Sequence, residues 1–363
     1  MSSLSLHEFH HGLNAQFTEI IGEEAVAHYG DWLKEHATLH DAAGILDLSF
    51  RGRLCLLGAD RQSFLNGQVT NNVKDLKIGQ GCYATLITAK GKMQADLNIY
   101  ILENEILLDF EPGLSETVKL RLEKYVISED VQIVDVASHY GLLSIQGPMA
   151  AAVLNRLALA FPIPERPLNF SSIKDETLGE IYLANHPRTG STGFDLFVPT
   201  HSLGAVADKL IAAAKEIGGG ACGWNALETA RIEAGIPRFG ADMDETNLPP
   251  EAGLDARAVS YTKGCYIGQE VIARIRTYGQ VAKALRGLRV ADDLKTLPAK
   301  GDKLFLGEKE IGYITSAIAS PMFKMNIALG YVRREGNKIG TELILRTKDS
   351  VCAAKIVELP FRF

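Results

Sequence analysis

Apolar and polar residues alternate with two different periods in the first third of the chain, and the period predicts which segments form helices and which form strands. Residues 4–38 repeat apolar side chains at helical spacing, which predicts a helical segment. Residues 44–58 and 83–110 alternate at every second position, which predicts strands with hairpin turns at AKGK and LENE. A short helix capped by Asp60 and an amphipathic helix at 113–126 complete a first α+β unit.

The next third of the chain repeats the same kind of content. Strands are expected near 131–136, 140–145, 178–184 and 193–198, and helices near 148–160 and 202–217. A helix from Asn225 to Glu233 and a polar loop at 240–262 follow. From residue 284 onward the pattern is one of short strands punctuated by glycines, which predicts a small β-barrel or sandwich.

Composition narrows the class of protein. A chain of 363 residues is expected to hold two or three domains, and its 46% hydrophobic and 23% charged residues are ordinary for a globular protein. Lys and Arg number 38 against 44 for Asp and Glu, which gives a net charge of -6. Binding to nucleic acid or to an anionic membrane through the whole surface is therefore disfavoured, and any anion site must be local.

The cysteines and the N-terminus indicate a compartment. The five cysteines, at 55, 82, 222, 265 and 352, have no metal-ligand spacing, so no metal site is readable, and a disulfide framework is improbable with an odd count. The N-terminus lacks the basic character of a targeting segment, and no stretch supplies the roughly 20 apolar residues of a membrane span. We expect a soluble, cytoplasmic protein without membrane contact.

The octapeptide KGCYIGQE at 263–270 is the most informative stretch. It places the Cys265 thiol between two glycines and close to Lys263, whose positive charge would favour the thiolate. A buried, inert cysteine is the alternative, and chemistry alone does not choose between the two.

A local excess of positive charge surrounds this motif. Residues 263–289 hold six cations against the single acid Glu270, a balance of +5. A solvated pair of strands with ordinary surface charges is one interpretation. The other is a small anion site in which arginines hold a carboxylate or a phosphate.

KGCYIGQE resembles the motif of the YgfZ-type folate-binding proteins, which are implicated in iron-sulfur cluster assembly and repair. Longer segments are similar to the wider superfamily of the glycine-cleavage T-protein, an aminomethyltransferase; they lie at 40–73, 188–199, 226–243 and 310–332. The resemblance implies an α+β, T-protein-like fold. Two interleaved α+β units would occupy residues 1–283, and a C-terminal β-barrel would occupy 284–363, around a central folate pocket.

The resemblance also implies a cofactor, tetrahydrofolate or a one-carbon derivative, and residues that bind it. Asp96 falls where T-proteins have an acidic pair near the folate, and Arg231 matches the arginine of the folate-region helix. Pairing of Arg231 with Glu233 or Asp255 is the structural alternative. Gln269 and Arg274 complete the expected folate-binding set, whereas Cys265, as the functional thiol, and Lys263 form the expected catalytic pair.

Two positions depart from the T-protein pattern. Ala95 replaces the first acid of the pair, and Ser191 replaces an acid of the central turn. Aminomethyl transfer requires stabilisation of a positively charged, iminium-like centre, so the loss of acids weighs against that reaction. Folate binding needs a flat apolar slot and a positive charge for the glutamate tail, which the 263–289 stretch could supply.

These observations lead to three ordered hypotheses for function. The first is a folate-binding protein that supports assembly or repair of iron-sulfur enzymes through Cys265, with those enzymes or their assembly factors as partners. The second is a tetrahydrofolate-dependent aminomethyltransferase of the glycine-cleavage type. The third is an accessory protein of tRNA modification, although stable nucleic-acid binding is not expected from the net charge.

Overall fold

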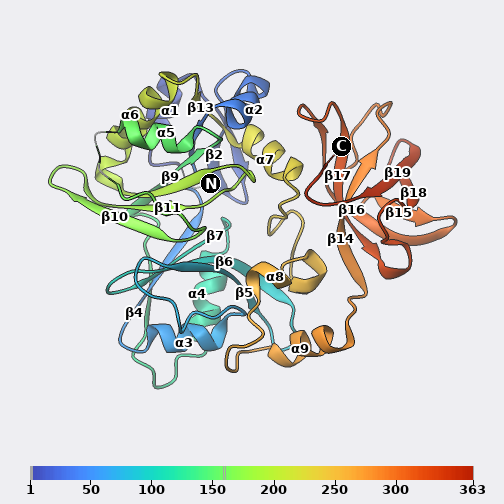
Figure 1. Cartoon of the computed structure of the whole chain (residues 1–363), viewed down its shortest axis with the longest axis horizontal. Coiled ribbons are helices and arrows are strands. Elements are labelled where there is room, and N and C mark those ends of the chain that lie inside the picture. The colour runs from blue at the N-terminus through green and yellow to red at the C-terminus, as the bar shows by residue number, and fades with distance from the viewer. Residues whose placement is uncertain (1–2, 158, 160, 363) are drawn as a thin grey trace. The chain divides into compact units, whose positions relative to one another are not determined.

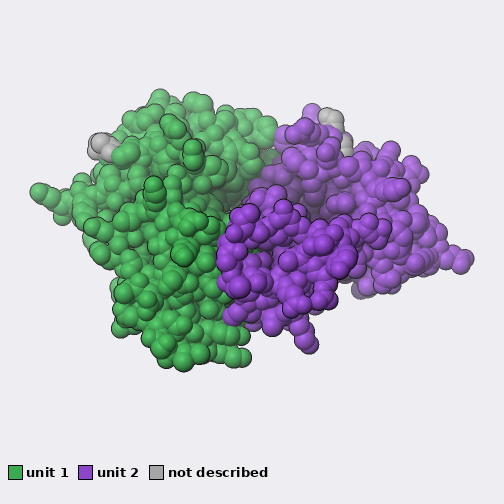
Figure 2. Space-filling view, turned by 60° about the horizontal axis from the view of Figure 1, so that its bottom comes forward, with its two compact units in different colours: residues 1–86, 95–230 green, residues 87–94, 231–363 purple. Residues whose placement is uncertain are grey.

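The structure is a computed structural model that describes residues 3–157, 159 and 161–362 (Figure 1). The chain divides into two compact units, coloured separately in Figure 2. Unit 1 comprises residues 1–86 and 95–230, and unit 2 comprises residues 87–94 and 231–363. No helix in the described part of the chain is long and apolar enough to cross a membrane.

The N-terminal segment differs from the sequence-based prediction. Instead of a continuous helical region at 4–38, it forms α1 (His7–Gly12), a hairpin of β1 (Gln16–Ile20) and β2 (Glu23–His28), and α2 (Trp32–Asp41). Ile21 and Gly22 both have positive φ values, 51° and 81°, as a tight hairpin turn requires. The prediction of helix was wrong for residues 16–28, because the few apolar residues of this short hairpin also fit helical spacing.

The first sheet of unit 1 carries two helices on one face. Its five strands are ordered β5-β6-β7-β4-β8. Their bounds are β4 (Gly52–Leu57), β5 (Gly81–Ile87), β6 (Met93–Ile101), β7 (Ile106–Phe110) and β8 (Gln132–Asp135), and the helices are α3 (Arg61–Gln68) and α4 (Ser115–Glu123). Apolar residues of both helices share one buried cluster with alternate residues of β4, β5, β6 and β7. The hairpins predicted at AKGK and LENE are confirmed.

The second sheet of unit 1 is built in the same way. Its six strands are ordered β10-β11-β12-β9-β3-β13. The bounds are β3 (Gly44–Asp47), β9 (Tyr140–Gln146), β10 (Phe170–Asp175), β11 (Gly179–Asn185), β12 (Gly193–Pro199) and β13 (Gly220–Ala221), with helices α5 (Ala150–Arg156) and α6 (Leu203–Lys215). Sequence analysis did not identify β10, whose residues are only partly buried.

The two sheets of unit 1 exchange strands. The chain places β3 in the six-stranded sheet and the next strand, β4, in the five-stranded sheet, and it returns between β8 and β9. The faces turned away from α3, α4, α5 and α6 share a further buried cluster, which includes Tyr100 and Leu107 from one sheet and Leu142 and Phe197 from the other. Unit 1 is therefore two helix-covered sheets packed face to face, and the predicted interleaved α+β architecture is confirmed.

Unit 2 contains the expected barrel and two helices that were not expected, one of them in the predicted polar loop at 240–262. After α7 (Trp224–Glu233) come the 3₁₀ turn η2 (Pro249–Ala252), α8 (Asp255–Ala258) and α9 (Gln269–Tyr278). The closed barrel is ordered β14-β17-β16-β15-β18-β19. Its strands are β14 (Lys283–Val290), β15 (Lys303–Leu306), β16 (Lys309–Ser320), β17 (Met325–Arg333), β18 (Glu342–Arg346) and β19 (Val351–Val357), with η3 (Arg334–Gly336) after β17. The interpretation of 263–289 as a pair of strands was thus wrong for α9.

Candidate functional site

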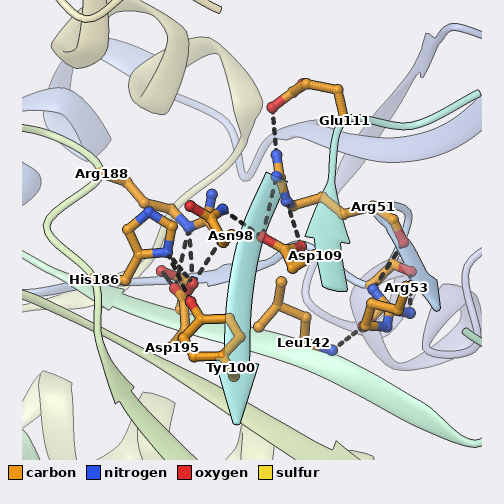
Figure 3. A network of polar contacts seen from close by, with 12 residues as sticks. Arg51, Arg53, Asn98, Tyr100, Asp109, Glu111, Leu142, His186, Arg188 and Asp195 are labelled. Carbon is orange, nitrogen blue, oxygen red and sulfur yellow. Dashed lines mark hydrogen bonds and ion pairs between the residues drawn. The ribbon is translucent and has the colours of Figure 1, made fainter. Parts of the chain in front are cut away.

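A network of buried charges lies between the two sheets of unit 1 (Figure 3), and Asp109 on β7 is its centre. The Arg51 Nε atom donates to Asp109 Oδ1 at 2.8 Å, and the Arg188 Nη2 atom donates to Asp109 Oδ2 at 3.2 Å. Asn98 Nδ2 donates to Oδ2 at 2.9 Å, while Arg51 also pairs with Glu111. Burial alone would raise the pKa of Asp109, but the charges of Arg51 and Arg188 outweigh burial and lower it.

Asp195 on β12 extends the network into the other sheet. Its carboxylate accepts hydrogen bonds from Arg188 Nη2 at 2.6 Å, from Ser144 Oγ at 2.7 Å and from His186 at 2.9 Å. Burial opposes ionisation of Asp195, yet the positive charge of Arg188 holds its pKa well below the usual range. Burial and Arg188 together lower the pKa of His186. Arg188 thus joins a carboxylate of each sheet.

Asp96 lies on the same face of β6 as Asn98, because side chains two apart on a strand share a face. The Tyr83 hydroxyl donates to Asp96 Oδ2 at 2.7 Å. Oδ1 is buried and has no hydrogen-bond partner. Burial and the negative charge of Glu111 raise the pKa of Asp96 to about 6, although Tyr83 and Arg51 lower it in part. Asp96 is therefore a carboxyl group with one oxygen available to accept a hydrogen bond and with a pKa close to neutral pH.

Ala95 lies on the opposite face of β6, in the apolar cluster beneath α3 and α4, and is fully buried. An acid at this position would point into that core, away from Asp96 and Asn98. The absence of an acid at position 95 therefore removes no charge from the face that carries the network. The objection to aminomethyl transfer that rested on Ala95 is accordingly wrong.

Arg231 was predicted to bind folate, with Glu233 or Asp255 as alternative partners. The structure places it at the end of α7, where it is buried and forms an ion pair with Asp242. Its Nη2 atom also donates to Ser316 Oγ on β16 at 3.1 Å. These contacts join the α7 segment to the barrel within unit 2.

The octapeptide KGCYIGQE forms a turn that leads into α9. Cys265 is exposed, and the Lys263 ammonium lies 5.0 Å from the centre of the Tyr266 ring. Gly268 immediately precedes α9 with φ of 81°, and a Cβ atom there would overlap the Thr88 carbonyl oxygen. Gln269 Oε1 accepts from the Tyr266 amide at 3.2 Å. Much of the motif therefore has a role in local structure.

The cations of the 263–289 stretch are distributed over the turn before α9, α9 itself and β14, and those described below make separate contacts. Arg274 pairs with Glu270 at 2.9 Å in an exposed contact on α9, and Arg276 lies over the Tyr261 ring. Arg289 pairs with Asp292. A common anion site formed by this stretch, and the predicted roles of Cys265, Lys263, Gln269 and Arg274, stay predictions.

The structure assigns the predicted site residues to different units. Asp96 belongs to unit 1, whereas Arg231, Lys263, Cys265, Gln269 and Arg274 belong to unit 2. The sequence pattern singled out neither the neighbours that act on Asp96, namely Tyr83, Arg51 and Glu111, nor the charged network of Asp109, Arg188 and Asp195. The available signal was a charged residue at an inward position of a strand that is otherwise apolar, as in LLDFE at 107–111.

Comparison with known proteins identifies the family. Residues 6–263 match the GCVT N-terminal domain, and residues 283–362 match the glycine cleavage T-protein C-terminal barrel domain. The chain belongs to the glycine cleavage T-protein family. The T-protein fold predicted from the sequence is thereby confirmed, with N-terminal α+β sheets and a six-stranded C-terminal barrel.

Relatives within the T-protein family are similar over nearly their whole length. Aminomethyltransferase of Halalkalibacterium halodurans is 31% identical over 90% of this chain and 89% of its own. Aminomethyltransferase of Symbiobacterium thermophilum is 29% identical over 98% and 96%. The crystal structure of the glycine cleavage system aminomethyltransferase T from Bartonella henselae superposes with a TM-score of 0.89 at 26% identity, and it covers 99% of this chain and 98% of that one.

These relatives correct the first hypothesis for function. A role in iron-sulfur cluster assembly or repair, drawn from KGCYIGQE, is wrong, because the similar proteins are named aminomethyltransferases. The YgfZ-type assignment, the iron-sulfur partners and the tRNA-modification alternative gain no support from them. The octapeptide was misleading for a physical reason: its second glycine and its glutamine shape a helix start, and such a local structure does not specify a reaction.

Proposed function

We propose that this protein is a tetrahydrofolate-dependent aminomethyltransferase of the glycine-cleavage type. The similarity of the whole chain to proteins named aminomethyltransferase supports the reaction class. The observation that carries the proposal within this chain is Asp96, a half-buried carboxyl group on an inner sheet face with one unsatisfied oxygen.

Asp96 differs from the other acidic residues on the inner faces of the two sheets. Asp109, Glu111 and Asp195 each form an ion pair with an arginine, whereas Asp96 has no cationic partner at ion-pair distance among the described residues. Its charge is therefore available to a ligand. A buried acceptor without a donor costs roughly 1–3 kcal/mol, which a ligand N–H group would recover.

The residues present fit a reduced pterin. Oδ1 of Asp96 offers an acceptor for a ring N–H group, and Tyr83, which orients the carboxyl group, contributes a flat aromatic surface. When bound, tetrahydrofolate supplies the nitrogen nucleophile that accepts the one-carbon unit.

Asp96 would have two roles in the reaction, stabilising a developing positive charge and accepting a proton. In its ionised form it stabilises the positive charge that develops as the aminomethyl carbon loses its bond to the donor. With a pKa of about 6, the same carboxylate is basic enough to accept a proton near neutral pH. Tyr83 fixes the carboxyl orientation, while Arg51 holds the neighbouring Glu111 in place and so preserves the electrostatic surroundings of Asp96.

The test is a transfer assay with an aminomethyl-loaded lipoyl carrier protein and tetrahydrofolate, which measures the folate product and released ammonia. We expect the wild-type protein to be active and Asp96→Asn to lose about 100-fold or more in rate. Asp208→Asn, on the exposed face of α6, is the matched control and should retain full activity. A wild-type protein without transfer would refute the proposal, and an active Asp96→Asn variant would refute the role of Asp96.

A further inference from the structure

The barrel of unit 2 contains a groove at the place where two of its strands separate. The ladder between β14 and β19 runs from Val290↔Ala354 to Gly287↔Val357 and goes no further. Beyond this point the two segments line a cavity of about 420 Å³ together with the turn after η3. We call this cavity the barrel groove; the residues that matter to its chemistry are Leu285, Arg286, Asn337, Lys338, Ile339 and Leu359.

Arg286 is the polar centre of the barrel groove. Its Nε atom donates to the Asn337 carbonyl at 2.9 Å, and its Nη1 atom donates to the Leu285 carbonyl at 3.2 Å. Both bonds go to neutral backbone groups, so they orient the guanidinium without neutralising it. Nη2 makes no protein hydrogen bond in the described part of the chain.

Charge and burial support an anionic ligand. Arg286 is half-buried, and burial lowers the pKa of its guanidinium group. Lys338 adds a second cation to the groove, against the single acid Glu358, and neither of these two side chains forms an ion pair within the described residues. Two hydrogen bonds to the backbone fix the orientation of the Arg286 guanidinium and leave N–H groups that can bind a carboxylate.

The remaining wall of the barrel groove is apolar. Leu285 and Leu359 line it, and Ile339 leaves 65% of its surface exposed at the rim. A volume of about 420 Å³ falls in the range of small-molecule sites. We propose that the barrel groove binds a small organic carboxylate with an apolar body, at a site that is separate from that of Asp96 and does not depend on the proposed function.

The experiment uses the full-length protein labelled with ¹³C at isoleucine methyl groups and titrated with 4-phenylbutyrate, observed by NMR. We expect the Ile339 methyl signal to shift with saturation. The uncharged 4-phenylbutanol, which has a similar apolar body, should bind at least tenfold more weakly. Arg286→Gln should weaken 4-phenylbutyrate at least tenfold, and Lys338→Gln about threefold. Lys348→Gln, an exposed lysine outside the groove, is the control and should change nothing.

The outcomes separate the alternatives. Arg286 also donates a hydrogen bond to the Asn337 carbonyl, so Arg286→Gln could disturb the fold. If that variant does not fold, Lys338→Gln still tests the proposal. An absence of binding, equal binding of the alcohol, or equal affinity in wild type and both folded variants would overturn the proposal. Displacement of 4-phenylbutyrate by tetrahydrofolate would overturn the separation of the two sites, whereas the transfer assay alone decides the proposed function.

Discussion

At the scale of single residues, the buried carboxyl groups of unit 1 differ in whether their surroundings lower or raise the pKa. Arg51 and Arg188 pair with Asp109, so its ionised form is stabilised and its pKa is lowered. Burial and the negative charge of Glu111 disfavour the ionised form of Asp96, so its pKa is raised to about 6. Asp109 helps to hold the two sheets together, whereas Asp96 is available for chemistry.

The raised pKa of Asp96 predicts a pH-dependent gain in stability for Asp96→Asn. A folded-state pKa of about 6, above the usual 3.8, means that the folded protein loses stability as pH rises from about 4 to 6. Asparagine does not ionise, so the variant avoids this loss. We expect Asp96→Asn to be more stable by on the order of 1–2 kcal/mol above pH 6.5 and by much less below pH 4.

Chemical denaturation at pH 4 and at pH 7.5 measures this difference, with Asp208→Asn as the control. An equal change in the free energy of unfolding at both pH values would show that Asp96 does not carry a raised pKa.

Cysteine environments predict an order of thiol reactivity. Cys265 is exposed, whereas burial raises the pKa of Cys55 and of Cys222 far above the usual value and raises that of Cys352 less. Because the thiolate is the reactive form, substoichiometric iodoacetamide should label Cys265 first. Mass-spectrometric mapping of the labelled peptides checks this, and earlier labelling of any other cysteine contradicts it.

At the scale of elements, KGCYIGQE joins α9 to the β5-β6 turn within unit 2. Gly268 adopts a left-handed conformation beside the Thr88 carbonyl, where a side chain would be strained and would also overlap backbone. Gly264 has no atom within 4 Å of a built Cβ and no left-handed backbone. The two glycines of one motif therefore have different requirements.

We expect Gly268→Ala to destabilise the protein by about 2–3 kcal/mol and to increase hydrogen exchange of the α9 amides. Gly264→Ala, the matched control, should change stability by no more than about 0.5 kcal/mol. Urea denaturation and exchange mass spectrometry provide the measurements. Equal effects of the two substitutions would mean that the conformation of Gly268 is not required.

At the scale of the whole molecule, the barrel of unit 2 has its own core and no open sheet edge, since its six strands close on one another. The segment from 231 to 248 adds buried polar contacts to it. Asp242 accepts hydrogen bonds from Thr315 and from Ser316, at 2.5 and 2.7 Å, and Glu233 accepts from Ser320.

We therefore expect a fragment of residues 231–363 to unfold at a temperature at least about 5 °C above that of a fragment of residues 283–363. Circular dichroism melting of both fragments measures the difference. If the two fragments melt together, the contacts of Asp242 and Glu233 contribute nothing net to the barrel.

The sequence by itself determined the elements whose pattern is local. Alternation in 83–110 predicted both hairpins, and glycine-punctuated strands after 284 predicted a barrel or a sandwich, because side-chain periodicity and turn residues act over a few positions. Asp96 could also be singled out, through a resemblance that extended along most of the chain. Local pattern failed at 16–28 and at α9, where short amphipathic segments fit more than one structure.

Only the tertiary structure decided which charged residues meet inside unit 1. Arg51, Asp109, Arg188 and Asp195 come together across two sheets from positions up to 144 residues apart, that is 195 minus 51. Strand exchange between the sheets produces that proximity, and no local signal encodes it. The raised pKa of Asp96 has the same origin, because it depends on burial and on the charge of Glu111, which the fold brings near.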